Sequence, residues 1–119
     1  MQRKPNISFE DFLRVDLRVG TVKRAEAFPE ARNPALKLWI WFGEDIGELK
    51  TSARITDLYQ PNQLIGRQLI AVVNFPAKQI GPFMSECLVT GVVDGAGVVT
   101  LLQPDLDVED GLCLSLIHI

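Results

Sequence analysis

Apolar positions recur at every second residue in the first half of the chain, which is the spacing of a half-buried strand. Residues 15–24 and 36–42 show this alternation most clearly. Shorter apolar runs predict further strands, at residues 48–55, 69–73, 83–93, 98–102 and 112–119. The turn residues 94–97 lie between two of these runs and predict a hairpin.

Two segments have helical features instead. Ser8, followed three residues later by Asp11, resembles a capping box and predicts a short helix over residues 9–14. Residues 57–65, followed by a glycine, predict a helical connection. Gly20 lies inside the long first strand, where glycine commonly marks a bulge or a sharp bend. Five or six short strands without β–α–β alternation predict an all-β, β-rich barrel.

Length and composition favour one domain over residues 1–119. The chain has 119 residues, of which 47% are hydrophobic and 23% are charged, enough to bury a core. No apolar run approaches the ~18 residues that a membrane span needs, so no membrane partner is expected. The polar N-terminus has no apolar leader segment, and Cys87 and Cys113 suit a reducing compartment, so a cytoplasmic location is expected. Pairing of these two cysteines stays open.

The charge is unevenly distributed along the chain. All twelve Lys and Arg residues lie within residues 1–78 against nine acidic residues, a net charge of +3. Residues 79–119 carry six acidic residues and no Lys or Arg, a net charge of −6. This distribution is therefore compatible with a local basic face that binds nucleic acid, although the whole chain has a net charge of −3. Chance together with an acidic tail is the alternative explanation.

The residues that most catalytic sites need are missing. His118 is the single histidine, so a histidine-based triad is not expected. One histidine and two widely spaced cysteines do not match a zinc site. Gly91, Gly95 and Gly97 flank a hairpin and open no helix, which excludes a phosphate-binding loop. We expect no enzyme, no catalytic residue, no metal and no cofactor.

Two features point to binding. Lys37, Trp39 and Trp41 share one strand face, where indoles can stack on bases and the lysine can neutralise phosphate. The alternative is that the indoles cover a second core or a subunit contact. The second feature is the loop at residues 74–89, in which two prolines restrict the backbone around Lys78.

Several segments in order resemble a known family. "VDLRVGTV" at 15–22, "TSARITDLYQPNQLIGRQLIAVVNF" at 51–75 and "AKQIGPFMSECLV" at 77–89 resemble the tRNA-binding domain. This OB-fold module occurs alone or appended to methionyl- and phenylalanyl-tRNA synthetases. "FPEARNPALKL" and "VVNFPAKQIGPFMSE" resemble its free-standing bacterial CsaA-like subfamily. The resemblance covers about residues 8–114.

The resemblance implies a five-stranded OB-fold barrel with terminal extensions, a homodimer built partly by the terminal segments, and no catalysis. It also implies two activities, namely binding of tRNA and binding of unfolded or export-bound polypeptides. Its RNA-binding positions correspond here to Lys37, Ser52, Asn74, Lys78 and Ser85. Glu86 and Cys87 replace the Gln-Gly of the general family, and an acid at this place opposes phosphate.

These observations lead to a hypothesis of a tRNA-binding, CsaA-like homodimeric chaperone without catalysis. The alternative is a peptide-binding export chaperone whose RNA binding is weak or vestigial. Contacts to peptide or to a second subunit are expected at Trp39, Trp41, Ile80, Phe83 and Met84. A third interpretation is a dimeric scaffold whose apolar patches are all interface. The apolar end at residues 112–117 favours a dimer, and residues 115–119 extend past the usual end of the family.

Overall fold

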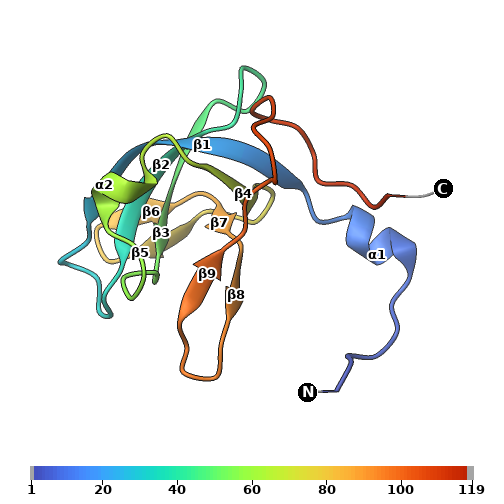
Figure 1. Ribbon diagram of the computed structural model, residues 1–119, viewed down its shortest axis with the longest axis horizontal. Helices are drawn as coiled ribbons and strands as arrows, with labels where there is room; N and C mark the ends of the chain where they lie inside the picture. The colour runs from blue at the N-terminus through green and yellow to red at the C-terminus, as the bar shows by residue number, and fades with distance from the viewer. Residues whose placement is uncertain (1, 118–119) are drawn as a thin grey trace.

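The computed structural model describes residues 2–117, which form a nearly closed antiparallel barrel with two short helices (Figure 1). The elements, in chain order, are α1 (Phe9–Leu13), β1 (Leu17–Ala27), β2 (Leu36–Trp41), β3 (Glu48–Ala53), α2 (Pro61–Leu64), β4 (Gln68–Val72), β5 (Lys78–Ile80), β6 (Phe83–Ser85), β7 (Leu88–Val89), β8 (Gly91–Val93) and β9 (Val99–Leu101). The predicted β-rich OB-fold barrel is therefore confirmed.

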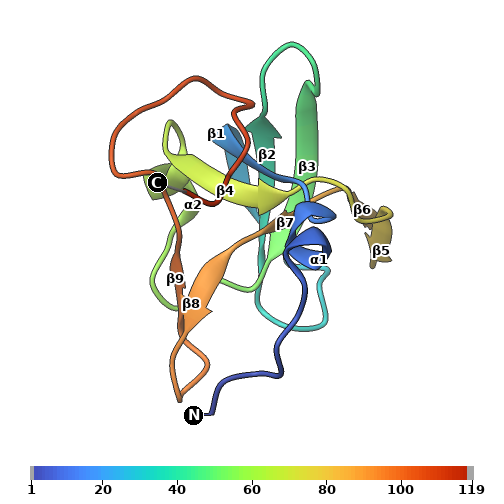
Figure 2. The ribbon, with the colours of Figure 1, turned by 90° about the vertical axis from the view of Figure 1, so that its right-hand side faces the viewer.

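The long strand β1 organises the barrel. The five-stranded sheet has the order β3-β2-β1-β4-β7, and every neighbouring pair is antiparallel. The first half of β1 pairs with β4 and its second half with β2, so one bent strand serves two sides of the barrel (Figure 2). The register shifts between Val22 and Arg24, where a bulge strengthens the bend.

The predicted bulge at Gly20 is wrong in position, because Gly20 itself lies in regular register with β4. Gly20 instead allows the backbone of β1 to approach the core side chains closely. A Cβ atom on Gly20 would lie 2.6 Å from Ile40 Cγ2 and 2.7 Å from Phe42 Cδ1. The missing side chain therefore lets β1 pass directly over these two core residues.

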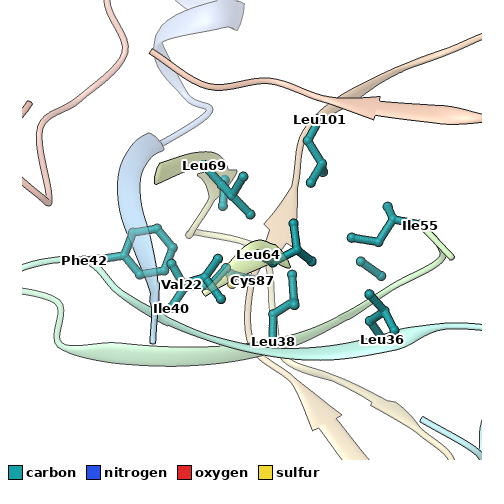
Figure 3. Packing of buried hydrophobic residues seen from close by; sticks show 12 residues of the cluster. Val22, Leu36, Leu38, Ile40, Phe42, Ile55, Leu64, Leu69, Cys87 and Leu101 are labelled. Carbon is teal, nitrogen blue, oxygen red and sulfur yellow. The ribbon is translucent and has the colours of Figure 1, made fainter. Parts of the chain in front are cut away.

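Side chains from most strands meet inside the barrel (Figure 3). Leu36, Leu38 and Ile40 of β2 are each at most 3% exposed, as their alternation predicted. The fully enclosed members of the core are Phe42, Leu38, Ile40, Leu64, Leu69, Val22 and Thr51. A second, smaller cluster outside the barrel joins Phe28, Ala35 and Phe83. This cluster packs the β5–β6 hairpin against the outer side of the sheet.

The predicted strand at 83–93 is broken into β6, β7 and β8. The break arises because Glu86 turns to pair with β3: its backbone N–H donates to Lys50 O at 2.8 Å, and its carboxylate Oε1 accepts from Lys50 N at 3.0 Å. These bonds help to close the barrel, because they join β3, one edge of the five-stranded sheet, to the segment that leads into β7, its other edge. The remaining hairpin, β8–β9, projects from the barrel in both views (Figures 1 and 2).

Two other predictions need adjustment. The helical connection at 57–65 is a single turn, α2, followed by Gly66 in the left-handed region (φ 89°). The final strand at 112–119 does not form within the described part, where one bridge joins Cys113 to Arg18. Its last residues, with His118, lie outside the described residues. Cys87 is buried and Cys113 is exposed, and both are free.

Candidate nucleic-acid interface

An open cavity of about 890 Å³ lies where four segments meet beside the end of β3. The loop between β1 and β2, the loop between β4 and β5, and the segment joining β6 to β7 form its other walls. Its lining consists of Ala31, Arg32, Asn33, Ala35, Ser52, Arg54, Phe75, Pro76, Ala77, Lys78, Ile80, Ser85, Glu86, Cys87 and Leu88. We refer to it as the basic cavity because of the charges described next.

Three of the lining residues are cations, and they come from three different segments. Arg32, Arg54 and Lys78 are exposed, and none of them forms an ion pair with another residue of the part described, 2–117. By contrast, Arg18 and Arg24 are paired with Asp16 and Glu26. The carboxylate in the lining is that of Glu86, and it already accepts the bond from Lys50 N. The basic cavity therefore has an excess of positive charge without a partner in the chain.

Hydroxyl groups form a directed chain along one wall. Thr51 Oγ1 lies 2.5 Å from Cys87 O, and a carbonyl oxygen can only accept, so the threonine proton points to that oxygen. Ser85 Oγ lies 3.0 Å from Thr51 Oγ1 and must therefore donate to it. The same Ser85 Oγ accepts from Ser52 N at 3.2 Å. The Ser85 hydroxyl is thus occupied by two bonds that tie β6 to β3.

Cys87 contributes an unreactive thiol to this wall. Its side chain is 3% exposed, and burial, aided by the neighbouring Glu86 charge, raises the pKa of the Cys87 thiol to about 12. The thiol therefore stays protonated and is not a nucleophile near neutral pH. Among residues 2–117, no group of three or more His, Cys, Asp or Glu side chains is arranged to hold a metal ion. None of the described helices has the length and apolar character to cross a bilayer.

Comparison with known proteins places this barrel in a family. Residues 17–112 match the family model described as "Putative tRNA binding domain". The chain belongs to the tRNA-binding domain family. The chaperone CsaA of Bacillus anthracis has a similar structure, with a TM-score of 0.88 and 51% identity over 93% of this chain and 100% of that one. The CsaA chaperone protein of Picrophilus torridus has a TM-score of 0.86 and 47% identity over 92% and 100% of the two chains.

Larger proteins also contain this domain. The methionine–tRNA ligase of Methanococcoides burtonii is 36% identical over 115 residues, which is 93% of this chain and 16% of the ligase. The ligase of Methanothrix thermoacetophila is 37% identical over 113 residues, with the same coverage. The chain thus spans about a sixth of the length of these relatives, and the ligase reaction cannot be transferred to it. The resemblance found in the sequence is confirmed.

Of the five positions predicted for RNA in this tRNA-binding domain, Ser52, Lys78 and Ser85 line the basic cavity. Lys37 lies next to it, since it pairs directly with Ser52 across β2 and β3. Lys37 Nζ is 4.9 Å from the centre of the Phe28 ring and 5.4 Å from that of Phe83. Its charge is therefore held against the second apolar cluster at the cavity's edge.

Asn74 lies elsewhere. Its Oδ1 accepts from Asp16 N at 3.0 Å, and its Nδ2 donates to Arg14 O at 2.8 Å. It lines a separate cleft with α1 and residues 113–116. In this domain Asn74 therefore fastens the end of β4 to the connection between α1 and β1, and its amide is already occupied.

Three of the five residues predicted for peptide or dimer contact, Trp39, Ile80 and Phe83, meet in the second cluster, and the other two are not part of it. Ile80 lines the basic cavity, and Met84 is 39% exposed on β6. Phe83 is only 7% exposed, so its side chain is largely withdrawn from the surface at which contact to peptide or to a second subunit was predicted. It is buried because its ring packs 5.5 Å from that of Phe28. Pro82 and Gly81 of the turn remain exposed.

The two indoles also have different surroundings. Trp39 packs edge-on against Phe83, 5.8 Å between ring centres, with the Arg24 guanidinium 4.2 Å from its ring centre. It therefore covers the second cluster, which was the alternative to base stacking. Trp41 instead lines another cleft with Glu44, Asp45 and Asp110. An acidic cleft repels phosphate, so the structure offers no RNA-stacking face at Trp41.

Sequence reasoning missed Arg32, Asn33, Arg54 and Phe75. Arg54 follows Ser52 by two residues, directly after the end of β3, and this spacing puts both side chains on the same side of the extended chain. Arg32 and Asn33 lie between Pro29 and Pro34, in the loop that the CsaA-like resemblance already covered. Phe75 closes the segment "VVNF", but nothing local indicates that its ring stays uncovered. Only the packing reveals that these side chains meet.

Proposed function

We propose that this tRNA-binding domain binds tRNA at the basic cavity and acts without catalysis in the cytoplasm. The observation that carries the proposal is the convergence of Arg32, Arg54 and Lys78, all unpaired within residues 2–117, on one open cavity. Lys37 adds a fourth cation at its edge. Phosphate groups are the anions that such a rim would neutralise, and the family membership supports tRNA as their source.

Titration of fluorescent tRNA at several salt concentrations tests this proposal. Three or four phosphate contacts predict a slope of log K against log salt of about −2 to −4. Arg54→Gln and Lys78→Gln should each make the slope shallower by about one. Arg67→Gln is the matched control, because its guanidinium lies 5.6 Å from the centre of the Tyr59 ring and outside the cavity wall. Absence of binding at low salt, or equal effects of all three substitutions, would contradict the proposal.

A second candidate function is binding of unfolded or export-bound polypeptide, in the manner of a chaperone. It is supported by the apolar part of the same lining, where Phe75, Ile80 and Leu88 are combined with an exposed Met84. The high similarity to two proteins described as CsaA chaperones also supports it. Suppression of the aggregation of a chemically unfolded protein measures this activity. If tRNA competes with that suppression, the two functions share the cavity, and if no suppression occurs, the second candidate is excluded.

We further propose that the domain works as a homodimer joined through its terminal segments. Leu13 of α1 is 60% exposed, and Leu112, Leu114, Leu116 and Ile117 are each at least 41% exposed. Leu13, Leu114 and Leu116 line one cleft between the two segments, so these apolar side chains lie on a shared surface. Light scattering at micromolar concentration should give twice the chain mass. Leu116→Asp should produce monomers, whereas Leu58→Asp, an equally apolar exposed site elsewhere, should not.

A further inference from the structure

We infer that the basic cavity holds a single unpaired nucleotide of RNA. The base would enter the cavity against the ring of Phe75, and the flanking phosphates would lie on Arg32, Arg54 and Lys78. This inference rests on the proposed function and deepens it, because it states which part of an RNA the domain recognises. A paired base cannot be the ligand, since its faces are stacked and its edge is engaged in the duplex.

Phe75 supplies the uncovered aromatic face. Its side chain is 52% exposed and lines the cavity. Ring contacts join both Phe28 and Trp39 to Phe83, whereas Phe75 has no ring partner among residues 2–117. An aromatic ring left open beside unpaired cations is the combination with which proteins stack single-stranded bases.

The backbone on both sides of Phe75 is restrained before any ligand binds. Asn74, the residue before Phe75, is fixed by its two hydrogen bonds to Asp16 N and Arg14 O. Pro76, the residue after it, restricts the backbone on the other side. Little conformational freedom of the Phe75 backbone is therefore lost when a base stacks on it.

Polar groups are also available to meet the edge of a base. Ser52 Oγ and the side-chain amide of Asn33 line the cavity and make no hydrogen bond to another residue of the described range 2–117. The Ser85 hydroxyl, by contrast, is occupied on both sides. Ser52 and Asn33 offer both donors and acceptors, which suits any base and predicts a modest preference among them.

The charge of the rim favours a nucleotide over a polypeptide. An apolar side chain would fill the walls but would leave Arg32, Arg54 and Lys78 without counter-charges. The cavity's carboxylate, Glu86, lies beside Lys50 and cannot balance all three. A nucleotide satisfies both features, because its base has flat aromatic faces that can stack and its phosphates are anionic.

The test compares two RNA probes built from strands of the same length. One is a single-stranded heptamer with a central 2-aminopurine, and the other is a GC-rich, blunt-ended duplex of two complementary heptamers, whose greater charge would favour the duplex if phosphate contacts alone decided binding. The heptamer should bind at least about five-fold more tightly than the duplex, and stacking should quench the 2-aminopurine emission. Phe75→Leu should weaken heptamer binding by about five-fold or more and abolish the quenching, while duplex binding stays unchanged. Phe75→Trp should preserve both effects, and Leu58→Ala serves as the remote apolar control.

The possible outcomes distinguish failure of the nucleotide cavity from failure of the more general proposal of tRNA binding. If the full chain binds both probes equally and Phe75→Leu changes neither, the nucleotide cavity is excluded while tRNA binding stands. If neither the probes nor tRNA bind, the proposed function fails as well. If an uncharged apolar peptide displaces the heptamer and heptamer binding does not depend on Phe75, the cavity belongs to polypeptide and the inference is overturned.

Discussion

Replacing Ser85 by alanine tests whether its hydroxyl stabilises the fold or contacts RNA. Ser85 is 6% exposed, and its Oγ accepts from Ser52 N at 3.2 Å while it donates to Thr51 Oγ1 at 3.0 Å. Ser85→Ala leaves the Ser52 N–H without its partner and removes one bond to Thr51, which still donates to Cys87 O. An orphaned buried donor costs about 1–3 kcal/mol. Because Ser52 is only half-buried and water can partly replace the bond, we expect a loss of about 1–2 kcal/mol in the free energy of unfolding.

Ser52→Ala is the matched control, since it removes a hydroxyl from the same cavity that makes no bond within residues 2–117. Its free energy of unfolding should stay within about 0.5 kcal/mol of the parent. Urea denaturation measures stability, and a tRNA titration on the folded proteins measures binding. Ser52→Ala should weaken tRNA binding about two- to ten-fold, the worth of one hydrogen bond, and Ser85→Ala should weaken it less. The assignment of roles is refuted if Ser85→Ala unfolds at the parent urea concentration and yet loses RNA affinity.

Three further substitutions test the packing around the site. Gly20→Ala should destabilise the barrel by about 1–3 kcal/mol in urea denaturation, because its Cβ would lie 2.6 Å from Ile40 Cγ2. Gly95→Ala is the control and should be nearly neutral, because a Cβ there would have nothing within 4 Å. Equal losses of stability in the two variants would contradict this account. Burial raises the pKa of the Cys87 thiol to about 12 in the folded state, above the value near 9 that it has in the unfolded chain. Its contribution to stability is therefore complete below pH 9 and is lost progressively as the pH rises toward 12. Cys87→Ala should remove that part of the pH dependence, and a thiol reagent at pH 8 should label Cys113 alone in the native protein. Asn74→Ala removes two hydrogen bonds and should lower the free energy of unfolding by about 1–2 kcal/mol; unchanged stability would restore Asn74 as a candidate for direct RNA contact.

The predicted elements that proved right are those whose cause is local. Ser8 caps α1 through its bond from Asp11 N, and the two residues lie only three positions apart. The alternation of β2 places Leu36 and Leu38 inside and Lys37 outside, as the spacing indicated. The hairpin turn at residues 94–97 joins β8 and β9 for the same reason. In each case, side chains within a few positions of one another decide the conformation.

The predictions that failed depend on distant partners. The apolar run at 83–93 has the composition of one strand, but pairing of Glu86 with Lys50 on β3 breaks it. Phe83 was expected at a contact surface, yet the ring of Phe28, far away in the sequence, covers it. Asn74 and Lys78 are near neighbours in the chain, but they face different clefts. No local pattern contains this information.

Residue patterns were enough to assign the family, the β-rich class, the inward and outward sides of the strands, and the basic character of residues 1–78. Which cations act together depends instead on contacts between distant segments. Arg32, Arg54 and Lys78 belong to separate segments, and barrel closure between β3 and the segment after β6 brings them to one cavity. Periodicity reports the face on which a side chain lies, whereas strand register and closure decide which faces meet.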